Sequence, residues 1–144
     1  MHDNVEQVRR LYEAAARRDF GVWAELLHEG VEWQAADRAT YYGPQAVLEG
    51  LVRRVSELDG FAIDIRRIIG AGDTVVVEAR YRAVGRTSGR VLDAPVAYVM
   101  DFRDGKIVRV QQYTDSWHIL EGARTAAPDG AVRLPLALSR GAAT

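Results

Sequence analysis

The fold is decided by the stretch Asp104-Gly-Lys-Ile-Val-Arg-Val-Gln-Gln-Tyr-Thr-Asp115. Its Asp-Gly pair is typical of a hairpin turn, because glycine adopts the positive φ that such turns need. The preceding run, residues 96–103, is the predicted partner strand. Side chains alternate along a strand, so Gln111, Tyr113 and Asp115 are expected on one face. We expect this face to line a cavity in a curved sheet.

Asp115 is the predicted proton-transfer residue of this cavity. A carboxylate placed beside aromatic and amide groups in an apolar hollow can have a raised pKa and act as a general acid or base. The alternative is that Asp115 caps the turn that follows it, and the sequence leaves both interpretations open. His118 lies three residues further on and can orient or pair with Asp115; a surface position at a strand end is its alternative.

Composition narrows the class of protein. The 144 residues, 48% of them hydrophobic, suit one packed domain. The net charge of −1, with interspersed signs, argues against nucleic acid as a partner. The absence of cysteine excludes disulfides and cysteine-bound zinc, and the three histidines lack metal-ligand spacing, so we expect no metal and no cofactor. No signal peptide or membrane-spanning run is visible, so we expect a cytoplasmic protein without a membrane partner.

Hydrophobic periodicity predicts an α+β domain. Apolar residues at helical spacing predict three helices, which begin near residues 4, 20 and 44 and end near residues 15, 30 and 58. Asp3 or Asn4 is the expected cap of the first helix. Alternation predicts strands over residues 31–35, 61–66, 75–83, 96–103 and 107–115. A curved antiparallel sheet packed on three N-terminal helices forms a cone-shaped barrel whose wide end is a default ligand site.

We assign residues 1–121 to this domain and residues 122–144 to a C-terminal tail rich in alanine, glycine and arginine. We expect the tail to be partly mobile, or to dock as an edge strand that covers the pocket.

Several segments resemble the SnoaL-like polyketide cyclases. They are Ala16-Arg-Arg-Asp-Phe20, Trp23-Ala-Glu-Leu-Leu27, Val31-Glu-Trp33, Gly43-Pro-Gln-Ala46 and the strand from Asp104-Gly-Lys-Ile107 to Tyr113-Thr-Asp115. That family belongs to the nuclear-transport-factor-like fold, which also holds ketosteroid isomerases and limonene epoxide hydrolases. The resemblance covers roughly residues 3–121 and implies the cone-shaped fold. It also implies that Asp115 stands where the cyclases carry their acid/base aspartate.

The sequence departs from the other activities of that fold. The epoxide hydrolases need an inward-facing Arg-x-Asp on the second long strand, where this chain is expected to turn Ala79 and Tyr81 inward and Arg80 outward. The isomerase base falls near Trp33, which cannot take a proton. The isomerase oxyanion-hole acid aligns near Tyr98, whose phenol can donate a hydrogen bond to an enolate.

The candidate site residues follow from these expected faces and loops. The catalytic candidates are Asp115, Tyr98, Asp37 and His118. The expected substrate-binding residues are Trp33, Tyr41, Tyr42, Tyr81, Met100, Gln111, Tyr113 and Trp117. For the aromatic candidates the alternative is a place in the core or in a solvent-facing turn, and for Asp37 it is a turn-forming role.

Two functions remain open from the sequence. The first is a cofactor-independent isomerase or cyclase, in which Asp115 removes a proton next to a carbonyl of a hydrophobic, polyketide-like molecule and Tyr98 steadies the enolate. The alternative is a non-catalytic small-molecule binder or accessory dimerisation domain, favoured by the lack of a complete hydrolase triad or isomerase base. We rank the enzyme slightly ahead.

Both functions share an expected homodimer. Val108 and Val110 are expected on the outer face of the sheet beside Val99, with no helix to cover them. Such an apolar patch usually marks a partner.

Overall fold

The structure is a computed structural model that describes residues 3–36 and 38–119. Its elements are α1 (Asn4–Ala16), α2 (Phe20–Leu26), β1 (Leu27–Gln34), β2 (Thr40–Tyr42), α3 (Pro44–Ser56), β3 (Leu58–Ala71), β4 (Thr74–Gly85), β5 (Val91–Arg103) and β6 (Lys106–Thr114). The expected α+β class is confirmed. The expectations for Asp37 and for the tail of residues 122–144 concern positions outside the described residues.

The six strands form one curled sheet in the order β2-β1-β6-β5-β4-β3. Four neighbouring pairs are antiparallel, whereas β1 and β6 run parallel, which corrects the expectation of a purely antiparallel sheet. A parallel pair needs a long connection, and the whole meander lies between these two strands. The second helix was also expected to reach about residue 30, but α2 ends at Leu26 and β1 begins at once.

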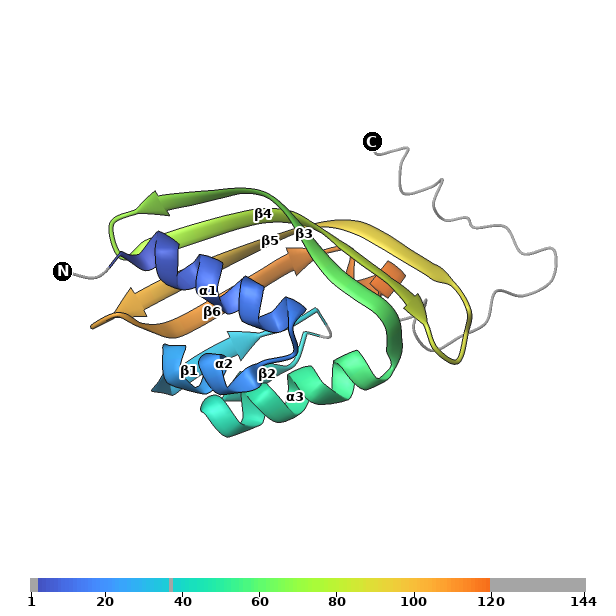
Figure 1. Ribbon diagram of the computed structural model, residues 1–144, viewed down its shortest axis with the longest axis horizontal. Helices are drawn as coiled ribbons and strands as arrows, with labels where there is room; N and C mark the ends of the chain where they lie inside the picture. Colours follow the sequence, from blue (N-terminus) through green and yellow to red (C-terminus); the bar gives the residue numbers. More distant parts are fainter. Residues whose placement is uncertain (1–2, 37, 120–144) are drawn as a thin grey trace.

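Helix α3 closes the open side of the sheet. The two edge strands are β2 and β3, and α3 contacts both of them as well as β1 (Figure 1). The helix starts at Pro44, where a missing N–H costs nothing. Gly43 before it has φ 86° and ψ 156°, a conformation that is open essentially only to glycine.

The core lies between the helices and the inner face of the sheet. Val8 and Leu11 of α1 are fully buried, as are Val77 of β4 and Met100 of β5. Full burial of such a side chain stabilises the fold by about 1.5–3 kcal/mol. Asp3 caps α1 as expected, since its Oδ1 accepts a hydrogen bond from the Glu6 N–H at 3.1 Å.

None of the helices in the described ranges is long and apolar enough to cross a membrane.

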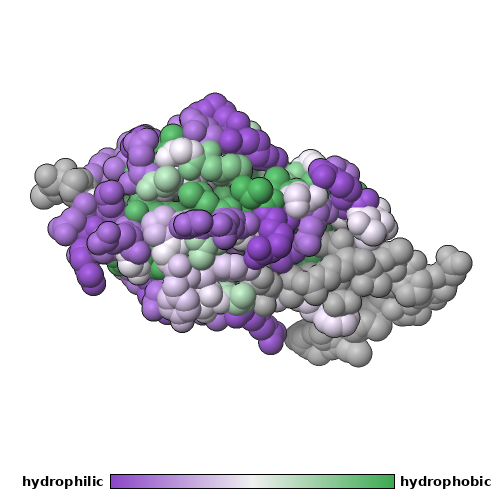
Figure 2. Space-filling model, turned by 90° about the horizontal axis from the view of Figure 1, so that it is seen from below, coloured by the Kyte–Doolittle hydropathy of each residue, from purple (hydrophilic) through white to green (hydrophobic). Residues whose placement is uncertain are grey.

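On α3, Val47 is 5% exposed whereas Val52 is 50% exposed, so part of this helix's apolar surface faces solvent. Figure 2 views the molecule from the side on which α3 lies and shows an apolar area bordered by polar side chains.

A bulge in β6 sets which side chains face inward. The register pairs Phe102 with Ile107 but Asp101 with Arg109, so Val108 is an extra residue without a partner in β5. One extra residue exchanges the two faces of the strand beyond it.

The prediction of which β6 side chains beyond the bulge face the cavity was therefore wrong. Val110 pairs with Met100 and is only 1% exposed, so it lies in the core and not on the outer face. Gln111 and Tyr113 were expected to face the cavity, but Tyr113 is 58% exposed and Gln111 shares its face. Gln112, which pairs with Tyr98, turns inward in their place.

The bulge predicts that replacing valine by threonine lowers the free energy of unfolding by different amounts at two positions of β6. Val110→Thr places a hydroxyl in the core and should lower the free energy of unfolding by about 1–3 kcal/mol. Val108→Thr, at a half-buried position of the outer face, should change it by less than about 0.5 kcal/mol. Urea denaturation measures both values, and equal costs would contradict the bulge.

Candidate functional site

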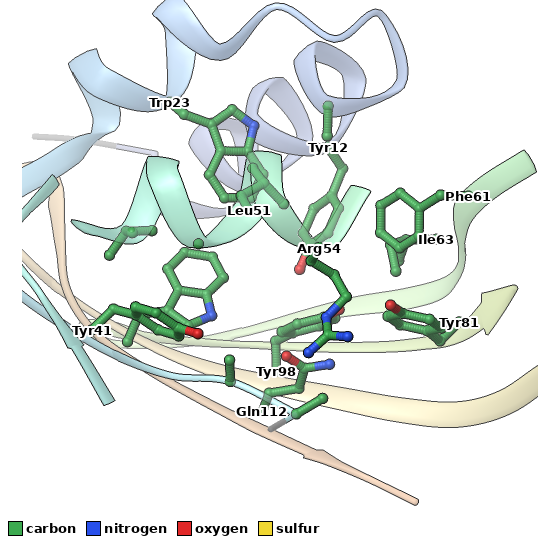
Figure 3. A pocket seen from close by; sticks show the side chains of 16 residues that line it. Tyr12, Trp23, Tyr41, Leu51, Arg54, Phe61, Ile63, Tyr81, Tyr98 and Gln112 are labelled. Atoms are coloured by element: carbon green, nitrogen blue, oxygen red, sulfur yellow. The ribbon is translucent and has the colours of Figure 1, made fainter. Parts of the chain in front are cut away.

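An apolar pocket lies between the helices and the inner face of the sheet (Figure 3). Its water-accessible volume is about 90 Å³, several times the roughly 10–15 Å³ that one water needs on the same measure. The described residues that line it are Tyr12, Ala15, Trp23, Trp33, Ala35, Ala36, Tyr41, Val47, Gly50, Leu51, Arg54, Phe61, Ile63, Tyr81, Tyr98 and Gln112. The pocket therefore has room for a small organic molecule.

A stacked pair of tryptophans forms one wall. The rings of Trp23 on α2 and Trp33 on β1 lie 5.4 Å apart between centroids with an interplanar angle of 26°. The Trp23 Nε1–H donates a buried hydrogen bond to the Leu11 carbonyl of α1 at 3.0 Å, which fixes the orientation of the indole. This wall is a preformed flat surface that suits a planar ligand.

Two further aromatic pairs complete the walls. Tyr12 of α1 and Tyr98 of β5 have ring centroids 5.8 Å apart. Phe61 of β3 and Tyr81 of β4 meet edge to face at 5.2 Å. Each pair joins two different elements and contributes about 0.5–1.5 kcal/mol beyond the burial of its surface. The packing that builds the fold thus also fixes the pocket.

Polar groups gather at one end of the pocket. In Figure 3 the hydroxyl oxygens of Tyr12, Tyr81 and Tyr98 point toward the guanidinium of Arg54, and the Gln112 amide lies beside it. The hydroxyls of Tyr12 and Tyr81 are buried and have no hydrogen-bond partner among the described residues. A buried donor left without a partner costs about 1–3 kcal/mol. This end of the pocket therefore offers two donors to a ligand.

Burial keeps these phenols protonated. It raises the pKa of Tyr12 well above its usual value, and the neighbouring Tyr98 adds to the effect. Burial raises the pKa of Tyr98 in the same way, with a further contribution from Tyr81. Burial also raises the pKa of Tyr81 to about 12, although the charge of Arg54 opposes the shift. At neutral pH all three groups are hydrogen-bond donors and not phenolates.

Helix α3 contributes a charged residue and part of the rim to the pocket. Arg54 is 18% exposed at its side chain, and its Nη1 lies 3.0 Å from the Glu57 carboxylate. Tyr41 packs on Gly50 so closely that a Cβ at that glycine would lie 2.9 Å from the ring. The Tyr41 hydroxyl accepts a hydrogen bond from Arg53 Nη2 at 3.4 Å. A residue with a side chain at position 50 would push Tyr41 away from this rim.

Asp115 does not lie in the pocket. Its side chain is exposed, its Oδ1 accepts a hydrogen bond from the His118 N–H at 3.0 Å, and its carbonyl accepts one from the Ile119 N–H at 3.1 Å. The capping alternative therefore describes its position, and the expected placement in the cavity was wrong because of the bulge. His118 does not pair with this carboxylate through its ring, since its Nε2 accepts from the Asp93 N–H at 3.1 Å.

The other candidates divide between the pocket and the rest of the molecule. The structure brings four of them together around the pocket: Trp33, Tyr41, Tyr81 and Tyr98. Met100 is fully buried but belongs to the core, so its expected place in the pocket was wrong. Tyr42 is 66% exposed, because it follows the inward-facing Tyr41 in the strand, and Trp117 is 70% exposed. Asp37 lies outside the described residues and stays a prediction.

Several lining residues were missed from the sequence. Tyr12 and Trp23 lie at helical spacing and were assigned to core packing, and Phe61 was assigned to a half-buried strand by its alternation with polar residues. All three line the pocket. Arg54 had a readable signal, because it follows Leu51 by three positions and Val47 by seven and so lies on the apolar stripe of α3. Within the described part of the chain, no three acidic or histidine side chains come close enough to hold a metal ion.

The buried phenols predict a loss of stability at alkaline pH. The unfolded chain releases the Tyr81 proton near pH 10 and the folded chain near pH 12, so the folded state holds more protons between these values. The contribution of the protonated Tyr81 to the free energy of unfolding is fully present below pH 10. It falls by about 1.4 kcal/mol per pH unit as the pH rises toward 12. Tyr81→Phe should reduce this loss without lowering stability at neutral pH. Urea denaturation across the alkaline range measures it; an unchanged pH dependence in Tyr81→Phe would contradict the assignment.

Comparison with known proteins places this architecture in a family. The model of the SnoaL-like domain matches residues 8–110, and a search of the curated proteins found no match. Among solved structures, an NTF2-like protein from Burkholderia thailandensis E264 is 27% identical, with a TM-score of 0.79 over 86% of this chain and 99% of that chain.

Two more distant structures share the fold and carry small molecules. A hypothetical protein with a ketosteroid isomerase-like fold from Catenulispora acidiphila DSM 44928, in complex with trimethylamine, is 20% identical with a TM-score of 0.74 over 88% of this chain and 97% of that one. TerC, co-crystallised with polyporic acid, is 23% identical with a TM-score of 0.73 over 85% and 98% of the two chains. Because the family model matches most of its length, this chain belongs to the SnoaL-like domain family.

Proposed function

We propose that the protein binds a small, planar, apolar molecule that carries carbonyl oxygens. The observation that carries this proposal is the pair of buried phenol hydroxyls, Tyr12 and Tyr81, that have no partner among the described residues and lie in an aromatic pocket. A carbonyl oxygen accepts up to two hydrogen bonds and would offset the cost of both donors. The stacked tryptophans offer the flat surface on which such a molecule lies.

The relatives support a ligand-binding role for the fold. TerC was co-crystallised with polyporic acid and the Catenulispora protein was solved with trimethylamine. Both are complexes of this fold with a small organic molecule, and binding such a molecule is the role that we propose for this chain.

An isomerase or cyclase is the second candidate, and the gathering of three phenols favours it. Donors aimed at one oxygen stabilise the negative charge of an enolate as it forms. Such a reaction also needs a group that takes the proton. None of the described residues that line the pocket is an aspartate, glutamate or histidine. Asp37, which follows the lining residue Ala36, lies outside the described residues and remains the candidate for this group. We place binding first because both candidate functions require it.

Acetonaphthone, a flat neutral ketone, tests both candidates. Its binding should quench the tryptophan fluorescence, since Trp23 and Trp33 line the pocket. Ala15→Phe fills the pocket and should abolish saturable quenching, whereas Ala16→Phe, at the exposed neighbouring position of α1, should leave it unchanged. Equal quenching in both variants would contradict the proposed site.

The same ketone separates binding from catalysis. In deuterated water, an isomerase or cyclase should accelerate exchange of the methyl protons next to the carbonyl, and Tyr98→Phe should lower that rate at least about tenfold. Asp115→Asn should have no effect, because Asp115 caps the end of β6 outside the pocket. Saturable binding with exchange at the buffer rate supports a binder and contradicts the catalytic candidate.

We also propose that the chain forms a homodimer through the outer face of the sheet. Val76 and Val99 pair across β4 and β5 on this face and are half-buried. Next to them Ala97 pairs with the exposed Tyr113 of β6. Helices α1, α2 and α3 pack on the opposite face, so they do not cover these side chains. An apolar surface of this kind supports a self-complementary interface.

Light scattering after size exclusion tests the dimer. The wild-type protein should have the mass of two chains. Val99→Arg should have the mass of one chain, because the two introduced arginines, one from each chain, would be buried close together at a two-fold interface. Ala24→Arg, at an exposed position of α2, is the matched control and should leave the dimer intact. A wild-type protein with the mass of one chain would contradict the proposal.

A further inference from the structure

The side-chain amide of Gln112 is a polar group of the pocket that the phenols leave unsatisfied. The bulge in β6 turns Gln112 inward, where it lines the pocket opposite its cross-strand partner Tyr98 of β5. Gln112 is half-buried, and none of the hydrogen bonds within residues 3–36 and 38–119 involves its amide. In Figure 3 the amide lies at the polar end of the pocket, next to the ring of Tyr98. A ligand that enters this end of the pocket therefore meets the amide.

The amide carbonyl of Gln112 differs from the other polar groups of the pocket. Indole and guanidinium N–H groups only donate hydrogen bonds, and a phenol hydroxyl both donates and accepts. Among the described side chains that line the pocket, the carbonyl of Gln112 is the one group that only accepts. A further donor is needed to satisfy this acceptor.

A ligand whose polar groups are all carbonyls leaves this acceptor without a partner. In the proposed complex Tyr12 and Tyr81 donate to the carbonyl of the ligand, so their hydroxyl protons are not shared with Gln112. A ligand that fills the pocket also displaces solvent from the half-buried amide, and a buried carbonyl that loses its donor costs free energy. A hydroxyl group on the ligand would supply that donor.

The strand register sets where such a hydroxyl lies relative to the ligand's carbonyl. Side chains that oppose each other across two antiparallel strands have Cβ atoms about 4.5–5.5 Å apart, so the Gln112 amide and the Tyr98 ring are close neighbours. The Tyr98 ring centroid in turn lies 5.8 Å from that of Tyr12, one of the two donors to the carbonyl. A hydroxyl on the same ring as the acyl group and meta to it suits this spacing, and it is too far from the ketone oxygen to bond to it internally.

We propose that Gln112 sets specificity for a ligand whose ring carries a hydroxyl group as well as a carbonyl. The hydroxyl donates to the amide carbonyl of Gln112, while the carbonyl accepts from Tyr12 and Tyr81. This inference rests on the proposed ligand-binding function and deepens it by naming the second polar group of the ligand. The stacked tryptophans contact the flat ring whether or not it carries a hydroxyl, so discrimination falls to Gln112.

Three substituted acetonaphthones test the inference. They carry a hydroxyl, a methyl or a methoxy group on the ring carbon meta to the acetyl group, so they share the ring and the ketone. The methyl group has nearly the size of the hydroxyl but is no donor, and the methoxy group keeps the oxygen without an O–H. Isothermal titration calorimetry should show the hydroxyl compound binding at least about tenfold more tightly than either of the others.

Two adjacent glutamines provide a matched pair of variants. Gln112→Met removes the amide from the pocket at nearly constant volume. It should abolish the preference for the hydroxyl compound without lowering the affinity for the methyl compound. Gln111→Met makes the same change on the outer face of the sheet, where Gln111 pairs with Val99, and should keep the full preference. Circular dichroism checks folding, and the three compounds test the wild-type protein even if Gln112→Met does not fold.

The outcomes separate this inference from the proposed function. Equal affinities of the wild-type protein for the hydroxyl and methyl compounds would overturn the role of Gln112, as would a methoxy compound that binds as tightly as the hydroxyl compound. A preference that survives in Gln112→Met, or binding of unsubstituted acetonaphthone but of none of the three compounds, would also overturn it and leave the pocket as a ligand site. Failure of all four ketones to bind would overturn the proposed function itself. A preference that is lost in Gln112→Met and kept in Gln111→Met confirms the inference.

Discussion

The single extra residue in β6 is the constraint on which the site depends. Val108 has no partner in β5, so the strand beyond it exchanges its faces. The exchange buries Val110 against Met100 and turns Gln112 into the pocket. It also carries Asp115 to the outside, where the carboxylate caps the following turn. The bulge thus decides which side chains of β6 reach the pocket.

Aromatic packing gives the pocket its shape at the same time as it holds the layers together. Trp23 with Trp33 and Tyr12 with Tyr98 connect the helices to the sheet, and both pairs are close enough to stabilise the fold. This packing leaves the hydroxyls of Tyr12 and Tyr81 buried, with no hydrogen-bond partner within residues 3–36 and 38–119. Each is a cost that folding bears and that a ligand with acceptor oxygens would remove. The affinity of the pocket and the stability of the empty protein are therefore linked.

The sequence predicted the layers well and the site only in part. Periodicity located all three helices and five of the six strands, because amphipathic patterns report which face is buried. Alternation along the strands also turned Tyr81 and Tyr98 inward, whereas Tyr41 was expected at the cavity rim from its place in a loop; all three line the pocket, as does Trp33. It failed for Gln111, Tyr113 and Asp115, since strict alternation assumes an unbroken register. The parallel pairing of β1 with β6 and the role of Tyr12 depend on distant contacts that local patterns do not contain.

Helix α3 connects the closure of the fold to the charge of the site. It contacts both edge strands of the curled sheet, so it lies across the open side between them. The same helix holds Gly50, against which Tyr41 packs, and Arg54, which lies at the polar end of the pocket. A shift of α3 would therefore move the guanidinium relative to the phenols of β4 and β5. Because Tyr81 and Tyr98 lie on the sheet and Leu51 and Arg54 on the helix, a ligand in the pocket that contacts both would also hold the two layers together and so stabilise the fold.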